Sequence, residues 1–185
     1  MRRKAVATVA AAGLIVGALA VTAAIPAEQR LTAPFVIAGD GSSTLTSRTI
    51  IATVTEWNFA DSITFDDEWS AEGNWLVVTL STSAPHTEDD AQIGLATLTV
   101  DGRTYTASER VPESLWRYPL RVGIGTSGVL AFELPAGVRS GSAELRLSSN
   151  DTTPALDDVI SISVNLTTLD HRERLTISSP TVGAP

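Results

Sequence analysis

The most hydrophobic part of the chain is the stretch from Ala5 to Ile25, whose 21 residues carry no charge. A helix rises about 1.5 Å per residue, so this stretch matches the hydrocarbon core of a bilayer, which is about 30 Å thick. Residues 1–4 contain three basic side chains, which favour the cytoplasmic side of a membrane. The pattern predicts a transmembrane signal anchor over residues 5–25, with residues 1–4 in the cytoplasm and the rest of the chain outside the cell membrane.

The same arrangement also fits a secretory signal peptide that is cut from the mature protein. Small residues at Ala18 and Ala20, or at Val21 and Ala23, would suit a cleavage site. The apolar core of a signal peptide usually has about 7 to 15 residues, and this stretch is longer, so we favour the uncleaved anchor. A secreted soluble protein is the alternative.

Beyond residue 48, apolar and polar residues alternate with the period of two that is typical of β-strands. Residues 74–81 are apolar on both faces, which predicts a central strand. The pair Asp101-Gly102 lies between two strand-like runs and predicts a two-residue type I′ hairpin turn. Seven segments have the strand pattern: 49–59, 74–81, 95–100, 103–107, 129–134, 143–147 and 159–166. They predict an all-β, immunoglobulin-like antiparallel β-sandwich over residues 48–169, preceded by one N-terminal transmembrane helix.

The segments on either side of this predicted domain have weaker patterns. Residues 26–47 contain two prolines and the run Gly41-Ser42-Ser43-Thr44, a composition that favours a linker. Within them, Leu31 to Ala38 is apolar and would alternatively form an extra edge strand. Residues 170–185 are expected to form a flexible tail.

Charge and cysteine content restrict the function. After the apolar stretch there are ten basic and 21 acidic residues, which give this part a net charge of −11. Nucleic-acid binding depends on Lys and Arg neutralising phosphates, so we expect no nucleic-acid partner. The chain has no cysteine, and this excludes disulfides, thiolate metal sites and thiol nucleophiles.

Three strand and turn motifs resemble a known family. They are Gly73-Asn74-Trp75-Leu76-Val77-Val78, Asp101-Gly102 followed by Arg103 to Tyr105, and Gly128 to Pro135. Over roughly residues 48–169 the chain resembles the uncharacterised immunoglobulin-like extracytoplasmic domain of small secreted or membrane-attached Gram-positive proteins, including actinobacterial ones. The resemblance implies a fold and carries no activity with it. Many members are tethered through a lipidated cysteine, and here the apolar helix would take over that tethering.

Two patterns that could indicate nucleotide binding or catalysis fail in their context. The run from Gly123 to Gly128 has the letters of a dinucleotide-binding motif, but a strand-like segment follows it where a helix is needed. We therefore expect a loop and no nucleotide. A Ser-His-Asp hydrolase needs a positioned histidine, whereas His86 lies in a polar loop and His171 in the predicted tail. We expect no catalytic residue, no cofactor and no enzymatic activity.

Acidic clusters occur at Asp66-Asp67-Glu68, Glu88-Asp89-Asp90 and Asp157-Asp158. Carboxylates could bind Ca²⁺ or act as a hydrolytic pair. No EF-hand spacing is present, so we expect a solvated surface and assign no metal ligand. A Ca²⁺-dependent envelope binding module is one alternative, and a carboxylate-based surface hydrolase is the least favoured one.

The chain has four tryptophans. Trp57 and Trp75 lie on predicted strands and are expected in the core. Trp69 and Trp116 lie in predicted loops, the second of them beside Tyr118. Packing within the loops is the favoured interpretation for these side chains, but exposed aromatic residues also commonly anchor partners. Trp69, Trp116 and Tyr118 are therefore the candidate partner-binding residues of a non-enzymatic, membrane-anchored module that binds a protein partner or accompanies a membrane complex in the cell envelope.

The uncleaved anchor leads to a prediction about mass. We expect the membrane fraction of cells to contain the protein at its full mass of 19.4 kDa, because residues 5–25 remain attached. Mass spectrometry of the membrane fraction and the culture fluid checks this. A shorter chain in the culture fluid, beginning after Ala20 or Ala23, would support cleavage instead.

Overall fold

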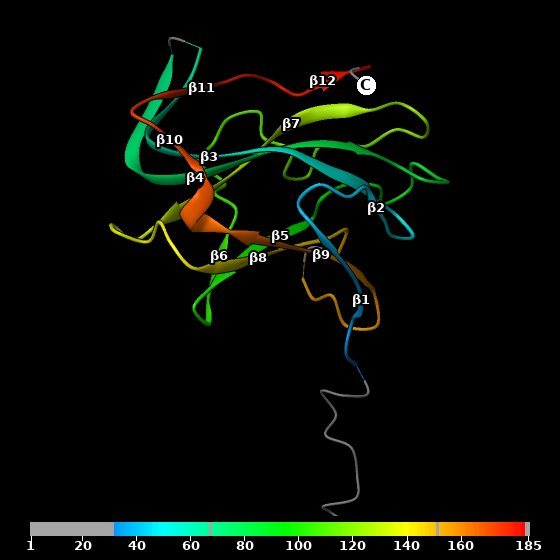
Figure 1. The fold of residues 1–185 in the computed structure, drawn as a ribbon. Helices are drawn as coiled ribbons and strands as arrows, with labels where there is room; N and C mark the ends of the chain where they lie inside the picture. The colour runs from blue at the N-terminus through cyan, green and yellow to red at the C-terminus, as the bar shows by residue number, and fades with distance from the viewer. Residues whose placement is uncertain (1–31, 67, 151, 184–185) are drawn as a thin grey trace, which may run out of the picture. The chain divides into compact units, whose positions relative to one another are not determined.

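Two β-sheets pack face to face in the computed structural model, which describes residues 32–66, 68–150 and 152–183 (Figure 1). Both sheets belong to one unit, Pro34–Pro185. The predicted anchor belongs to the preceding unit, Met1–Ala33, and lies outside the described residues. In the part of the chain that the structure describes, no helix is long and apolar enough to cross a membrane.

The first sheet has five strands in the order β1-β9-β8-β5-β6. The second sheet has seven strands. Five of them follow the order β10-β3-β4-β7-β12, and the other two, β2 and β11, also pair with β3. The strands of the first sheet are β1 (Phe35–Asp40), β9 (Asp158–Asn165), β8 (Ser142–Ser148), β5 (Leu95–Val100) and β6 (Arg103–Thr106). Those of the second are β2 (Leu45–Thr46), β3 (Ile51–Phe65), β4 (Trp69–Ser83), β7 (Thr126–Leu134), β10 (Asp170–Arg172), β11 (Leu175–Ile177) and β12 (Thr181–Val182). A short 3₁₀ helix, η1 (Leu166–Thr168), follows β9.

The prediction of an all-β sandwich with antiparallel sheets is confirmed. Strands β3 to β9 overlap the seven segments in which the sequence predicts strands. The structure corrects the bounds of two of them, because β3 continues to Phe65 and β4 begins at Trp69, so Trp69 lies on a strand and not in the predicted loop. Three strand pairs are parallel: β1 with β9, β10 with β3, and β11 with β3. In each pair one strand, β1, β10 or β11, lies outside the seven predicted segments. The hairpin turn between β5 and β6 is also confirmed, because Asp101 and Gly102 have φ angles of 47° and 76°, as a type I′ turn requires.

The predicted linker and tail are wrong over much of their length. Strand β1 lies within residues 26–47 and pairs with β9 along all six of its residues, from Phe35 to Asp40. The alternative expectation of an extra edge strand is therefore the one that the structure confirms. Strands β10 and β11 lie within residues 170–185 and pair with β3. These flanking segments become ordered because they complete sheets whose edges would otherwise expose unpaired backbone groups.

A bulge in β3 changes which of its residues face the core. The pairing of β3 with β4 shifts register between Val54 and Glu56. Val54 before the shift and Phe59 after it are both buried in the main core, and Trp57 packs against that core. Strict alternation along the sequence places Val54 on the opposite face from Trp57 and Phe59. The extra residue of the bulge brings all three to one face.

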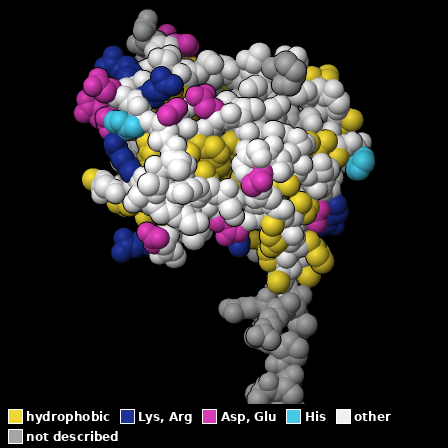
Figure 2. Space-filling model, viewed as in Figure 1, with side chains coloured by type: hydrophobic (Ala, Val, Ile, Leu, Met, Phe, Trp, Pro, Cys, Tyr) yellow, Lys and Arg dark blue, Asp and Glu magenta, His cyan; other side chains and the backbone are white. Residues whose placement is uncertain are grey.

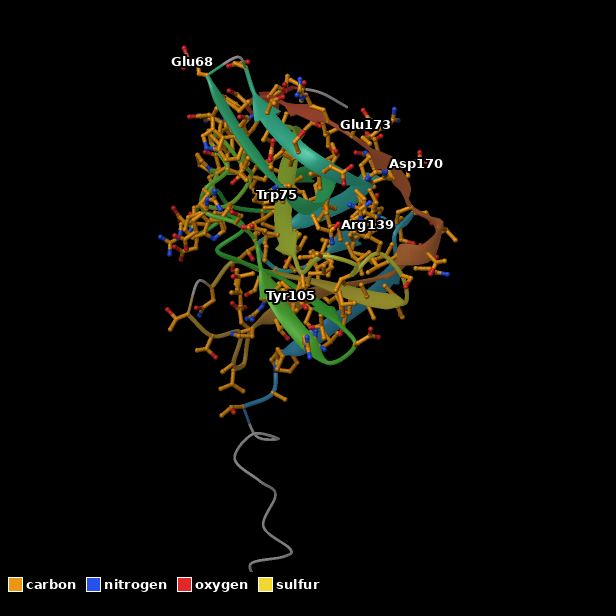
Figure 3. All side chains as sticks on the ribbon, turned by 90° about the vertical axis from the view of Figure 1, so that its left-hand side faces the viewer. Glu68, Trp75, Tyr105, Arg139, Asp170 and Glu173 are labelled. Carbon is orange, nitrogen blue, oxygen red and sulfur yellow. The ribbon has the colours of Figure 1, made fainter. Side chains whose placement is uncertain are left out.

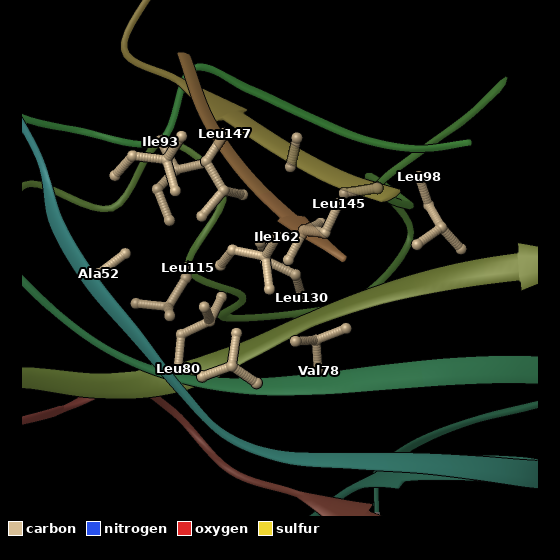
Figure 4. Packing of buried hydrophobic residues seen from close by; sticks show 14 of the residues in the cluster. Ala52, Val78, Leu80, Ile93, Leu98, Leu115, Leu130, Leu145, Leu147 and Ile162 are labelled. Atoms are coloured by element: carbon tan, nitrogen blue, oxygen red, sulfur yellow. The ribbon is translucent and has the colours of Figure 1, made fainter. Parts of the chain in front are cut away.

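The main core fills the space between the two sheets (Figure 4). Val78 and Leu80 of β4 lie opposite Leu98, Leu145 and Ile162 of the first sheet, and all five side chains are fully buried. Burial of each such side chain contributes about 1.5 to 3 kcal/mol relative to exposure, so this cluster is the main source of stability in a chain without disulfides.

A smaller second core lies on the outer face of the second sheet. Trp75 and Val77 of β4 alternate with the inward residues of that strand and are fully buried in this second core. They pack with Val111 from the connection between β6 and β7 and with Ile177 of β11. Strand β4 is therefore buried on both faces, as the sequence predicts for a central strand.

The second core predicts that the C-terminal segment contributes to stability. Ile177→Ala should destabilise the protein by about 2 to 5 kcal/mol, because it removes buried methyl groups and leaves a cavity in the second core. Ser179→Ala, at an exposed position two residues further on, should change the free energy of unfolding by no more than about 0.5 kcal/mol. Urea denaturation of the two variants measures the difference. Equal stabilities would indicate that the segment behaves as a tail.

Candidate functional site

The β3–β4 hairpin extends beyond the first sheet. Both of its strands have 15 residues, whereas β5, β8 and β9 of the first sheet have six, seven and eight. Within the hairpin the main core ends at Phe59 and Leu76, and only the second core continues towards the tip. Figure 3 shows the hairpin rising to Glu68 at its tip, at the opposite end of the unit from the start of the described chain. The inner side of the hairpin tip is therefore left to solvent.

We call this uncovered side of the hairpin the overhang face. Along each strand, its residues alternate with buried residues of the second core. The cross-strand pairs Ser62–Glu72 and Thr64–Ser70 belong to the overhang face. The pair between them, Ile63–Ala71, is buried on the other side. Strand β11 extends the face, because Thr176 is paired with Thr64 and the Thr64 hydroxyl donates to the Thr176 hydroxyl over 3.2 Å. The overhang face comprises Ser62, Thr64, Ser70, Glu72, Arg174 and Thr176.

Two open hollows follow one another along the overhang face. The hollow nearer the tip has a volume of about 580 Å³ and is lined by Thr64, Asp66, Glu68, Trp69, Ser70, Arg174 and Thr176. The next hollow has a volume of about 800 Å³ and is lined by Asp61, Ser62, Glu72, Gly73, Asn74, Ala136, Gly137, Arg139 and Glu173. Both linings contain hydroxyl groups or carboxylates and one guanidinium group each, so the surface can form hydrogen bonds and ion pairs with a ligand.

A polar network forms the base of the second hollow. Arg139 donates to the Asp61 carboxylate, and its Nε donates to Oδ1 of Asn74 over 2.8 Å. The Asn74 amide in turn donates to the carbonyl oxygens of Pro135 and Val138, over 2.9 and 3.1 Å. The network fixes the β7–β8 connection against the hairpin, and it engages the Arg139 guanidinium with Asp61 and Asn74.

His171 joins this network from β10. Its Nε2 lies 3.1 Å from Oδ1 of Asp61. The sequence places His171 in a solvated tail, and that expectation is corrected here, since the parallel pairing of β10 with β3 brings the two side chains together. The Ser62 hydroxyl donates to the carbonyl oxygen of Glu173 over 3.1 Å and is thus engaged with the backbone.

The hydrogen bond from Arg139, followed by that from His171, lowers the pKa of Asp61.

The three candidate partner-binding residues do not lie together. Trp69, at the start of β4, packs against the second core and lines the hollow nearer the tip. Trp116 and Tyr118, in the connection between β6 and β7, pack against the main core. The indole N–H of Trp116 donates to the carbonyl of Gly94 over 3.0 Å, and the guanidinium of Arg117 lies 4.5 Å from the ring centroid. Of the three, Trp69 is the one that lines a hollow of the overhang face, although its side chain packs on the second-core side of the hairpin.

The other candidate sites have ordinary structural surroundings. The run from Gly123 to Gly128 overlaps β7, which begins at Thr126, so the expected loop covers only its first three residues, and a strand follows as predicted. Asp157 and Asp158 both form ion pairs with Arg48, at 2.8 and 3.4 Å. Among residues 32–66, 68–150 and 152–183, no group of three or more His, Cys, Asp and Glu side chains is placed to hold a metal ion.

The residues that build the overhang face could not be found from the sequence. Asp61, Asn74, Arg139 and Arg174 come from four separate segments, and no local motif joins them. The signal that was available is the alternation at Ile63 and Phe65 and at Trp69 and Ala71, beyond the predicted segments. It indicates a hairpin longer than the opposing strands, and such a hairpin must leave part of one face uncovered.

The fold is similar to that of two solved structures, both at low identity. One is a candidate lipoprotein, YcdA, of Bacillus subtilis, with 12% identity and a TM-score of 0.46 over 69% of this chain and 39% of that one. The other is an uncharacterised β-sandwich protein of Clostridium difficile, with 8% identity and a TM-score of 0.44 over 71% of this chain and 94% of that one. The chain thus spans well under half of the Bacillus protein. No protein-family model and no curated protein sequence matches it.

The network around Asp61 predicts a pH-dependent contribution to stability. Because the folded state lowers the pKa of Asp61 below its ordinary value of 3.8, this carboxylate stabilises the fold above pH 3.8, and its contribution is lost as the pH falls through the lowered pKa. Asp61→Asn should therefore lower the urea midpoint at about pH 7, and the difference from the native protein should shrink as the pH falls below 3.8. Asp170→Asn, at an exposed carboxylate of β10, is the matched control. An Asp61→Asn difference that persisted at low pH would refute the assignment.

Proposed function

We propose that this chain is a non-enzymatic, single-span membrane protein whose immunoglobulin-like sandwich lies outside the cell membrane and binds a protein partner through the overhang face. The observation that carries the proposal is the concave polar surface left uncovered at the end of the β3–β4 hairpin.

The strand order supports the immunoglobulin-like assignment. The paths β9-β8-β5-β6 and β3-β4-β7 follow the order G-F-C-C′ and A-B-E of immunoglobulin-like sandwiches, with strand D absent from the second path. In sandwiches of this class, partners commonly bind at the loops and strand ends of one end of the domain. The overhang face lies at such an end.

The membrane attachment is supported by the apolar stretch over residues 5–25 and the basic residues before it. The motifs that resemble extracytoplasmic Gram-positive domains support the same location, and the actinobacterial origin stays a prediction from that resemblance. Retention of the segment decides between a tethered module and a secreted one.

The charges of the overhang face indicate the chemistry of the partner. Asp66, Glu68, Glu72 and Glu173 line the two hollows, where Arg139 is already bonded to Asp61. Carboxylates thus outnumber the guanidinium groups that are left for a ligand. A partner segment with Lys or Arg side chains and backbone groups for hydrogen bonding complements this surface, and opposite charges would also accelerate association.

Site-directed crosslinking tests the location and the surface together, because the native chain has no cysteine. Ser70→Cys places a thiol on the overhang face, and Thr104→Cys places one on the exposed edge strand β6. We expect a membrane-impermeant, thiol-reactive photocrosslinker to label both variants in intact cells and to capture a partner from Ser70→Cys alone. Adding Glu72→Lys should reduce the captured product about tenfold through charge repulsion.

The possible failures separate the two parts of the proposal. If neither variant is labelled until the cells are opened, the external location is wrong. If both variants are labelled but give the same products, or if Glu72→Lys leaves the Ser70→Cys product unchanged, the overhang face is not the binding surface.

A further inference from the structure

An apolar patch lies at the point where the described chain begins. Phe35, Val36 and Leu156 are among the most exposed large apolar residues of the described chain, with exposed fractions of 59%, 50% and 56%. Their backbones lie close together, because β1 pairs with β9 from Phe35 opposite Asp158, and the Phe35 N–H donates to the carbonyl of Asp157 over 2.9 Å. Phe35 and Val36 are consecutive in the edge strand, so their side chains extend the apolar surface on both faces of that edge. Figure 2 shows hydrophobic side chains gathered where the described chain starts. We call these three residues the β1 patch.

The backbone conformation at Leu156 indicates that folding does not require a leucine side chain at this position. Its φ of 57° lies in the left-handed region, where Gly or Asn is accommodated with less strain than Leu. The side chain is exposed, so burial in the core does not offset the strain. An exposed leucine in this conformation suggests a function for the side chain itself.

The charged groups beside the patch are largely neutralised. Arg48 forms ion pairs with Asp157 at 2.8 Å and with Asp158 at 3.4 Å, and its backbone N–H also donates to Asp158 over 2.9 Å. The carboxylates of Asp157 and Asp158 therefore disfavour contact with an apolar or zwitterionic surface much less than unpaired carboxylates would.

The length of the connecting chain indicates what covers the patch. Only residues 26–34 separate the predicted membrane span from Phe35. A fully extended chain of this length reaches about 35 Å at most, and any bend brings the patch closer to the bilayer. Phe and Leu side chains partition readily into the boundary between headgroups and acyl chains.

We infer that the β1 patch lies against the lipid surface and orients the domain on the membrane. This inference rests on the membrane attachment in the proposed function and adds an orientation to it. Figures 1 and 3 agree that β1 and the tip of the β3–β4 hairpin lie at opposite ends of the unit. Contact of the β1 patch with lipid holds the overhang face away from the bilayer, where a partner can reach it.

Depth-dependent fluorescence quenching tests the inference on the full chain, reconstituted in phosphatidylcholine vesicles. Leu156→Cys and Glu68→Cys each provide one thiol for an environment-sensitive fluorophore, because no native cysteine competes. Lipids with a nitroxide near the headgroup should quench the label at position 156 about twofold or more relative to the label at position 68. Adding Val36→Glu to the Leu156→Cys variant should reduce that quenching.

The substitution Leu156→Asn distinguishes a membrane role from a structural one. Asn relieves the left-handed strain and removes the apolar side chain, so the urea midpoint should be maintained or raised. In the Val36→Cys background, the same substitution should reduce quenching of a label at position 36. A drop in stability without a change in quenching would assign Leu156 to folding and overturn the inference.

The remaining outcomes are separated by vesicle flotation. If the protein floats with the vesicles but labels at positions 156 and 68 are quenched equally, the membrane attachment holds and the orientation is wrong. If the protein does not float, the attachment itself fails, and the inference fails with it. If mild oxidation joins two copies of Leu156→Cys while the label is not quenched, a second copy of the chain covers the patch, and the lipid contact is overturned.

Discussion

The rest of the structure depends on the burial of β4 on both of its faces. Its inward side chains form the main core with the first sheet, while Trp75 and Val77 point outward and must be removed from water on the other side. A single opposing sheet cannot do this. The connection between β6 and β7 supplies Val111, and the C-terminal segment supplies Ile177. The chain beyond β9 is consequently part of the folded domain, where β10 and β11 pair with the open edge of β3.

The same requirement explains the candidate site. Because the second core continues along the outer face of the hairpin, β3 and β4 stay paired well past the point where the first sheet ends. The inner face of that extension has no apolar cover, and its residues are Ser, Thr, Glu and Arg. Arg139 and Asn74 then connect the extension to the β7–β8 connection, and His171 connects it to β10. A concave polar surface arises where one face of the hairpin is needed for stability and the other is not.

The two ends of the unit differ in chemistry. At one end, β1 presents exposed apolar side chains beside charges that are already paired, which suits an environment of low polarity. At the other end, the overhang face presents hydroxyl groups and an excess of carboxylates, which suits a hydrated, basic partner. The proposed attachment to a membrane and the proposed binding of a partner therefore use opposite ends of one rigid sandwich.

The sequence alone predicts a strand at each of β3 to β9, without the hairpin tip over residues 60–73, and the turn at Asp101-Gly102. It can do so because alternation with period two and positive φ at a two-residue turn are local properties of the chain. It also identified β4 as a central strand from its apolar residues on both faces. Tertiary structure decided which short segments became edge strands, because β1, β10 and β11 are held by the open edges and uncovered faces of distant strands. It also decided, through the bulge in β3, that Val54 and Phe59 share one face. The overhang face could be found only in three dimensions, since its residues come from segments that the register of the sheets brings together.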